Sequence, residues 1–489
     1  MADETADGAT TVSRRNYLKA GAATLSGIVF ASGNAAADQH TEDGGSSENR
    51  LLITDGTVVT VDPQHGVLDR ADILVEDGEI AALGTDLNAG GADVIDASGS
   101  VVVPGFVNSH LHTWEAGVRG IAGDWSFLEY LEKMLGEISA NYRPRDAYLG
   151  NLFGAVQQLN AGTTTILDWF HIANTPRHTD RAIDGLEDAG IRAVFTHGPP
   201  GDDSAKWWDN SDATHPDDIQ RLARNTFPSD DGLLTLAMGI RGPDYSTDEV
   251  VAQDIETARE LGIPASMHIG SLGGGGVRKL EELGLLGDDL NYVHANRLSD
   301  AEHALIGDSG GSISTTPEVE LQMGMGMPVF GKAIDSGAIP TIGVDVVSNV
   351  SDDMFTQARM ALQVQRGLDN QDTVEAGQQI QSVSRPARRV LEASTIDGAR
   401  ALGLEDRIGS ITPGKRADIT VIDGGDLNTA PVHDPVETVV FQSGIENVDT
   451  VIVDGDIRKR NGLVYNQTAQ EHLDRLVASG RRMLRESDI

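Results

Sequence analysis

A repeated alternation of apolar, strand-like runs with helical stretches between Pro104 and Leu391 constrains the fold of this chain more than any other feature. After the first run, the strand-like runs are GTTTILDW, RAVFTHG, LLTLAMGI, PASMHIG, LNYVHAN, GSISTTP and PTIGVDV. Strands that alternate with helices in this way are typical of a parallel α/β architecture. A doubly wound sheet usually carries a glycine-rich phosphate loop after its first strand, and none follows here, so the pattern favours a barrel.

Short β-rich runs flank this region on both sides. LLITDGTVVTVD, ADILVEDGEIAALG and DVIDASGSVVVPGF precede it, and RADITVIDG and VDTVIVDGDIRKRNG follow it. We expect residues 51–103 and 392–460 to form one small β domain from both chain ends, and residues 104–391 to form the barrel. Residues 461–489 would close the chain with an amphipathic helix.

The N-terminus matches the pattern of an export signal. Residues 13–19 read SRRNYLK, which matches the twin-arginine pattern, and an apolar stretch from Ala20 to Phe30 and a run of small residues follow. The stretch is too short, and too rich in glycine and alanine, to span a bilayer stably. We therefore predict a twin-arginine signal peptide at 1–37 and a polar linker at 38–50. The twin-arginine export machinery would carry the folded protein to the cell surface or the extracellular space.

The composition narrows the chemistry. The 489 residues include 75 acidic and 37 basic side chains, for a net charge of −38. This balance argues against a nucleic acid partner, because phosphate backbones are bound through clustered lysine and arginine. A surface so acidic is typical of salt-adapted, halophilic proteins. The chain has no cysteine, so a metal must be held by histidine and carboxylate.

Five polar residues lie at or just beyond the ends of strand-like runs. His110 and His112 end the run PGFVNSHLH, and two residues apart on a strand they point to the same face. Three later runs end near His268, His294 and Asp345. Barrel enzymes place their active sites at the C-terminal ends of the strands. Neutral imidazoles with one carboxylate predict a zinc or iron(II) site with a position left open for water.

The blocks around these residues resemble the amidohydrolase superfamily, in the branch that contains cytosine deaminase and the atrazine chlorohydrolases. PGFVNSHLH is similar to that family's first-strand motif. Four further segments of this chain are similar to later blocks of that family: GTTTILDW, VHANRLSDAEHALIGDSGGSISTTPEVELQMGMG, IGVDVVSNVSDDMF and IDGARALGLEDRIGSITPGKRADITVID. The resemblance covers residues 51–460 and implies a distorted (β/α)8 TIM barrel with a small β-sandwich domain formed by both chain ends.

The resemblance also implies a role for each residue of the set. His110, His112 and His268 would bind one divalent metal, zinc first and iron(II) as the alternative, and Asp345 would complete the shell. Asp345 would also act as general base toward a metal-activated water, while His294 orients that water and polarises the substrate.

The lysine content favours a single metal. Members of the superfamily with two metals bridge them through a carboxylated lysine. Only Lys133 and Lys206 lie between the second and third histidines of the set, and neither ends a strand-like run.

One departure from the family pattern concerns proton transfer. Deaminases of this branch carry a glutamate three residues after the histidine of the fifth strand, where this chain has Ser271. A serine at its ordinary pKa cannot shuttle protons alone. Glu115, Glu318 or Glu320 could supply the missing acid, although solvated loop acids are equally expected in so acidic a chain. The departure weakens the prediction of ring deamination and leaves attack by an activated water intact.

Four further residues are candidates for substrate contact. His171 and His197 follow strand-like runs, Trp114 follows the histidine pair, and Glu320 follows the sixth-strand block. Structural hydrogen bonding or core packing is the alternative for each.

Together these features predict a metal-dependent hydrolase that acts on a carbon–nitrogen bond of a small-molecule substrate, by deaminating an aminated N-heterocycle. The alternative is a hydrolase of an amide, a carbamate or a halogenated ring that works without a glutamate shuttle. An exported binding protein without catalysis is a weaker hypothesis, because all five expected positions are intact. Family members often form homo-oligomers, and by analogy this chain could do so.

Overall fold

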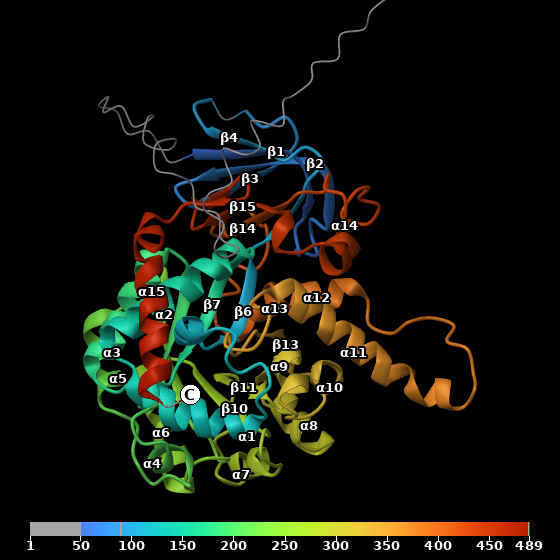
Figure 1. Cartoon of the computed structure of the whole chain (residues 1–489). Helices are drawn as coiled ribbons and strands as arrows, with labels where there is room; N and C mark the ends of the chain where they lie inside the picture. Colours follow the sequence, from blue (N-terminus) through green and yellow to red (C-terminus); the bar gives the residue numbers. More distant parts are fainter. Residues whose placement is uncertain (1–49, 89, 488) are drawn as a thin grey trace, which may run out of the picture.

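An eight-stranded parallel sheet dominates the computed structural model, which describes residues 50–88, 90–487 and 489 (Figure 1). Each strand is hydrogen-bonded to the next one along the chain. The strands are β6 (Phe106–Leu111), β7 (Thr163–Phe170), β8 (Arg192–His197), β9 (Leu234–Ile240), β10 (Ala265–Ile269), β11 (Leu290–His294), β12 (Ser312–Thr315) and β13 (Ile339–Ile342). Each overlaps a strand-like run of the sequence, so the predicted parallel α/β architecture is confirmed.

The first and last strands close this sheet into a barrel. The amides of Val344 and Asp345 donate to the His110 carbonyl at 3.1 and 2.9 Å, and the His112 amide donates to the Asp345 carbonyl at 2.8 Å. This bridge pairs Leu111 with Asp345 in parallel. The predicted TIM barrel is confirmed, and its seam is formed by the backbone of candidate metal ligands.

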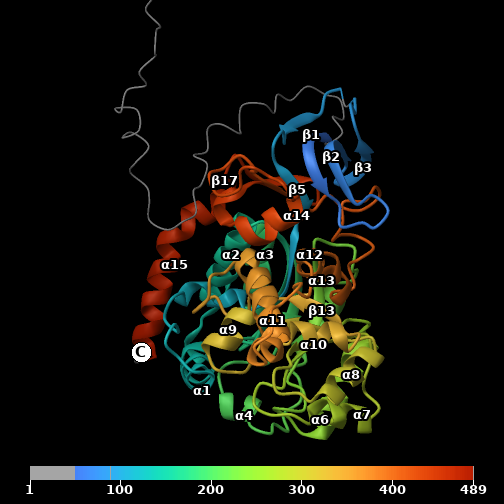
Figure 2. The same ribbon diagram turned by 90° about the vertical axis from the view of Figure 1, so that its right-hand side faces the viewer.

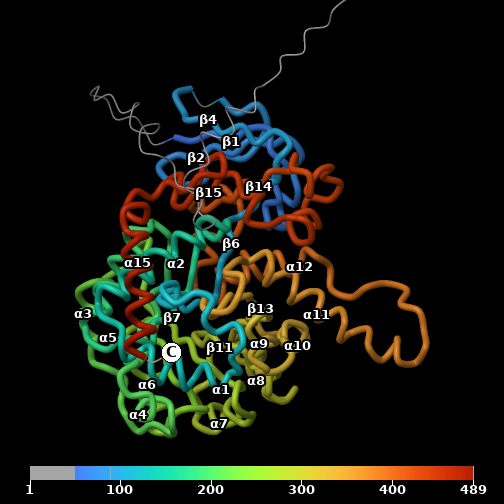
Figure 3. The backbone as a smooth tube through the Cα atoms, in the orientation of Figure 1, coloured from blue at the N-terminus to red at the C-terminus, as the bar shows by residue number. Residues whose placement is uncertain are grey.

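Helices cover the outside of the barrel (Figures 1 and 2). α3 shows how the sequence sets their limits: it begins with Pro176 in its first turn and ends at Ala189, just before Gly190, whose φ of 73° suits a residue without a side chain. β7, beneath this layer, is buried along its whole length, as expected of a strand covered on both faces. The tube in Figure 3 shows the C-terminal part of α11 and the chain that follows it extending away from the barrel.

The helices of this region are as follows: α1 (Phe127–Tyr130), α2 (Pro144–Asn160), α3 (Pro176–Ala189), α4 (Ser204–Trp208), α5 (Asp218–Arg221), α6 (Asp248–Leu261), α7 (Gly276–Glu282), α8 (Asp300–Asp308), α9 (Pro317–Gln322), α10 (Phe330–Asp335), α11 (Met354–Glu375), α12 (Ala387–Ala393) and α13 (Ile396–Ala401). A π-helical segment, Leu131–Ile138, continues directly from α1.

The second sheet is built from both ends of the chain, as predicted. Its strands are β1 (Arg50–Val59), β2 (Val67–Glu76), β3 (Glu79–Gly84), β4 (Asp93–Asp96), β5 (Val101–Pro104), β14 (Ile419–Ile422), β15 (Val448–Val453), β16 (Asp456–Arg460) and β17 (Leu463–Val464). The order is β17-β16-β15-β14-β5-β1-β2-β3, with β4 on β1. The two ends meet where β5 runs antiparallel to β14. After α14 (Pro435–Glu437) and this sheet, α15 (Gln467–Glu486) returns along the barrel and packs against α2.

A buried ionic cluster ties the barrel to the second sheet. Arg192, at the start of β8, is 2% exposed. Its guanidinium donates to both carboxylate oxygens of Asp418 at 2.8 and 3.0 Å, and to Asp454 at 2.8 Å. Because a buried guanidinium needs compensating charge, these contacts fix the two domains relative to each other.

The predictions for the N-terminus concern residues that the structure does not describe. The signal peptide at 1–37 lies outside the described residues, and the linker at 38–50 does so except for Arg50, which begins β1. Among the described helices, none has the length and apolar character needed to cross a membrane.

Candidate metal centre

Five side chains from four places in the chain converge at the C-terminal end of the barrel. His110 lies in β6 and His112 follows it, His268 lies in β10, His294 ends β11, and Asp345 follows β13. His294 and Asp345 adopt left-handed backbone conformations, with φ of 74° and 72°. Such conformations are sparsely populated and cluster at functional sites.

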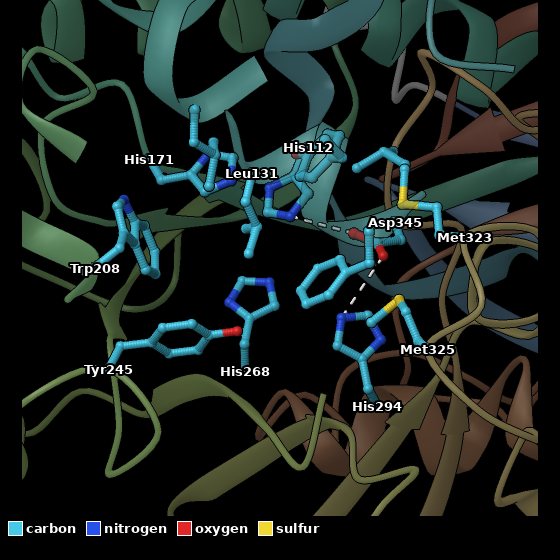
Figure 4. A pocket seen from close by; sticks show the side chains of 14 residues that line it. His112, Leu131, His171, Trp208, Tyr245, His268, His294, Met323, Met325 and Asp345 are labelled. Carbon is cyan, nitrogen blue, oxygen red and sulfur yellow. Dashed lines mark ion pairs between the residues drawn. The ribbon is translucent and has the colours of Figure 1, made fainter. Parts of the chain in front are cut away.

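The ligand atoms of these residues lie close together. Nε2 of His110 and Nε2 of His112 are each 3.2 Å from Oδ1 of Asp345, and Nε2 of His268 is 3.2 Å from Nε2 of His110. His294 Nε2 lies 3.7 Å from Asp345 Oδ2. One ligand atom from each of His110, His268, His294 and Asp345 lies within 4.8 Å of the others. Figure 4 shows four of these side chains, His112, His268, His294 and Asp345, turned toward one another.

The protonation of the imidazoles suits a divalent cation. His112 donates from Nδ1 to the Trp169 carbonyl at 2.8 Å, which leaves its Nε2 lone pair for the centre. Burial lowers the pKa of His110 to about 4 and that of His268 well below its ordinary value, so both are neutral and offer a lone pair. Burial also lowers the pKa of His112, but its contact with Asp345 outweighs this and raises the pKa. Burial raises the pKa of Asp345, but its contacts with His110 and His112 outweigh this and hold the pKa well below its usual range. Neutral imidazoles around one carboxylate fit zinc or iron(II).

His294 is oriented by a hydrogen-bonded chain behind it. Glu320 Oε1 accepts from the Thr316 hydroxyl at 3.2 Å and from the Thr316 amide at 2.9 Å. Because that hydroxyl proton is used, Thr316 Oγ1 accepts from Nδ1 of His294, at 3.0 Å. These hydrogen bonds therefore place the Nδ1 proton of His294 away from the pocket and turn its Nε2 toward Asp345.

A pocket opens beside these ligands. One part of its lining is apolar, and we call this part the apolar wall: Phe127, Leu131, Leu135, Met323, Met325 and Val346. The rest consists of His112, His268, His294, Asp345, Tyr130, His171, Trp208 and Tyr245. Figure 4 shows Leu131, Met323 and Met325 around the space that the histidines enclose.

His171 is the one predicted substrate contact found among the described lining residues. Its ring stacks on His112 with centroids 4.0 Å apart. Its Nδ1 accepts from the Trp114 indole at 3.0 Å. Because an indole can only donate, the proton of a neutral His171 resides on Nε2.

The other three predicted contacts lie elsewhere. Trp114 is fully buried behind His171, and Glu320 is fully buried behind Thr316. His197 Nδ1 lies 2.9 Å from His215 Nε2, in a separate polar cluster. These placements differ from the prediction because a position after a strand-like run does not determine which way a side chain turns.

Two residues, Ser271 and Glu115, bear on the missing glutamate shuttle. Ser271 is 1% exposed, and its hydroxyl has no hydrogen-bond partner in the part of the chain that the structure describes. Glu115 is fully buried and accepts from the Tyr130 hydroxyl at 2.6 Å, so it contacts a residue of the pocket lining. Burial raises the pKa of Glu115 to about 7. Glu115 meets this tyrosine only because α1, which carries Tyr130, lies against the site. No pattern in the sequence predicts that position of α1.

Neither lysine that could have bridged two metals lies at the centre. Lys133 pairs with Glu129 at 3.2 Å, and the ammonium of Lys206 lies 4.4 Å from the centroid of the Trp207 ring.

Comparison with known proteins places these features in a family. The model of the amidohydrolase family matches residues 101–458. A 5'-deoxyadenosine deaminase of Methanosarcina mazei is 28% identical over 421 residues, which cover 83% of this chain and 92% of that protein. A 5-methylthioadenosine/S-adenosylhomocysteine deaminase of Moorella thermoacetica is 28% identical over 441 residues, 86% of this chain and 97% of that protein.

Solved structures show the same architecture. The crystal structure of an adenosine deaminase from Xanthomonas campestris with bound zinc superimposes with a TM-score of 0.75 at 25% identity, covering 90% of this chain and 98% of that one. The zinc complex of an atrazine chlorohydrolase from Arthrobacter aurescens TC1 has a TM-score of 0.75 at 23% identity, with coverage of 89% and 100%. At that identity the second likeness establishes the fold alone.

Proposed function

The chain belongs to the amidohydrolase family, and from that premise we propose that it removes the amino group of an aminated N-heterocycle by hydrolysis, with one divalent metal, zinc in the first instance. The convergence of four histidines on the Asp345 carboxylate carries the proposal. The names of the similar deaminases support it and make adenine-type amines the first compounds to test.

The residues divide the work of the reaction. A metal held by His110, His112, His268 and Asp345 would lower the pKa of a coordinated water to about 7. Asp345 would accept a proton from the attacking water, because it is charged and lies among the histidines of the centre. His294, whose Nδ1 is hydrogen-bonded to Thr316, would direct Nε2 toward the attacking water and the substituents of the carbon that it attacks. Glu115, behind Tyr130, is the acid we propose in place of the shuttle that Ser271 cannot supply.

A test follows from this division. The full chain would be purified in molar salt, its metal measured by elemental analysis, and ammonia release assayed on aminopurines, aminopyrimidines and aminotriazines. We expect release that is abolished in His110→Ala together with metal binding. An unchanged metal content and rate in that variant would overturn the proposal.

The lack of a glutamate at Ser271 favours a second candidate, hydrolysis of an amide, a carbamate or a halogenated ring. Zinc-loaded protein that releases no ammonia from the panel but cleaves such compounds would establish it. Glu115→Gln distinguishes the two, since only deamination by our scheme depends on Glu115.

We also propose export in folded form, supported by the SRRNYLK pattern at 13–19. Replacing both arginines of the pattern by lysine should leave the protein inside the cell, as measured by fractionation.

A further inference from the structure

We propose that the pocket takes a flat heteroaromatic amine whose other substituents are apolar, such as alkyl groups, and disfavours the same ring carrying a ribosyl group. This inference rests on the proposed function and narrows its substrate class. It also goes against the names of the similar deaminases, whose substrates are adenine nucleosides.

The apolar wall meets the space beside the ligands from two sides. Phe127, Leu131 and Leu135 come from α1 and the π-helical segment, and Met323 and Met325 come from the chain after α9. The Phe127 amide donates to the Met323 carbonyl at 3.0 Å, so the backbone holds the two sides together. A substituent that leaves the ring on this side therefore meets carbon and sulfur, which favour apolar groups.

The polar groups of the lining are few, and most are engaged. The Tyr130 hydroxyl donates its proton to Glu115. Nδ1 of His171 is used by Trp114, which leaves Nε2 as a donor. Asp345 is the one carboxylate among the described lining residues, and it belongs to the metal centre.

The polar groups that are left suit a ring rather than a sugar. His171 stacks on the ligand His112, and Figure 4 shows the Tyr245 hydroxyl directed toward His268. Both therefore lie at the metal end of the pocket, where the edge of a heterocycle would be held. The Trp208 indole N–H, which is buried without a hydrogen-bond partner among the described residues, offers one further donor. A ribose directed to the apolar wall would leave its vicinal hydroxyls buried without partners, and an unpaired buried hydroxyl is costly.

A matched pair of compounds tests this inference on the unaltered protein. 9-Butyladenine and 5'-deoxyadenosine share the reacting amine and the ring, and differ only in an alkyl or a ribosyl substituent. We would measure kcat/KM for ammonia release and, separately, the dissociation constant by calorimetry on the zinc-loaded full chain. We expect both constants to favour the butyl compound by about tenfold or more.

The outcomes separate this inference from the proposed function. Preferred binding of the butyl compound without ammonia release from any amine would support the pocket assignment while the proposed function fails. Equal or tighter binding of the nucleoside, or no binding of either compound, would overturn the inference even if deamination occurs.

A variant checks that the apolar wall is the cause. Leu131→Gln places an amide among these side chains, so the preference for the butyl compound should narrow by about fivefold or more. Leu368→Gln is the matched control, because Leu368 is 36% exposed on α11 and outside the pocket lining as described. An unchanged preference in Leu131→Gln would refute the assignment, and a failure of this variant to fold would leave the compound pair as the deciding measurement.

Discussion

Replacing Thr316 by valine tests whether the hydrogen-bonded chain behind His294 contributes to catalysis. The substitution keeps the shape of the side chain and removes only the hydroxyl. That hydroxyl joins Nδ1 of His294, at 3.0 Å, to Glu320, at 3.2 Å, in a fully buried environment. The imidazole would lose the partner that holds its Nδ1 proton and its orientation.

The structure sets the size of the effect. Hydrogen bonds behind a metal-site histidine typically contribute about 10- to 100-fold in activity or affinity, or about 1.4 to 2.8 kcal/mol. Glu320 Oε1 lies 3.5 Å from the same Nδ1 and can recover part of the loss. We therefore expect kcat/KM to fall by about 10- to 30-fold, with metal content retained.

The neighbouring threonine supplies the control. Thr315 is also buried, but its hydroxyl finds no hydrogen-bond partner within the described chain. Removing an unpaired buried hydroxyl is nearly neutral or stabilising, so Thr315→Val should change kcat/KM by less than about twofold. The assay is steady-state ammonia release on the best substrate, with urea unfolding to confirm that both variants fold. A loss below about threefold in Thr316→Val, or an equal loss in both variants, would refute the reasoning.

Three further predictions concern stability. Arg192→Met leaves Asp418 as an uncompensated buried charge and should lower the free energy of unfolding by about 3 to 5 kcal/mol in urea titrations. The control is Arg181→Met, which breaks the exposed ion pair with Asp184 and should lower the free energy of unfolding by less than about 1 kcal/mol. Similar losses of stability in the two variants would contradict the argument. Removing metal with a chelator should lower the melting temperature, and zinc should restore it in the wild type but not in His110→Ala. A melting temperature that the chelator does not change would contradict the proposed metal site. Burial raises the pKa of Asp244 from 3.8 to about 6, so the stability tied to its neutral form is present below about pH 4 and is lost as the pH rises through about 6. The free energy of unfolding of Asp244→Asn, measured relative to that of the wild type, should accordingly increase by roughly 3 kcal/mol as the pH rises from about 4 to about 8. A difference between the two proteins that does not change with pH would exclude this account.

Most of the barrel and the convergence of its polar residues could be predicted from the sequence, because both depend on locating the ends of the buried strands. Buried parallel strands are continuous apolar runs, so their ends can be located, and His110, His268 and His294 lie at such ends. Since parallel strands end at one face, the sequence alone brings these side chains near one another.

What the sequence did not predict depends on approach between distant segments. Tyr130 reaches the pocket only because α1 folds back across it, and no periodicity reports that path. Thr316 lies behind His294 because a left-handed backbone turns the histidine toward it. Trp114 and Glu320 were expected to face the substrate, but packing placed each behind a residue that they hydrogen-bond or support.

The barrel seam has a consequence for how the protein acquires its site. His110 and Asp345 are 235 residues apart, and their backbones complete the last pairing of the barrel. Bringing such distant segments together carries a large loop-closure entropy, which makes contacts of this kind slow to form. Ligands on the intermediate strands can assemble earlier, but the carboxylate joins the histidines only when the chain's first and last barrel strands meet. Any intermediate with an open seam would therefore hold a metal poorly, and metal uptake would report the final step of folding.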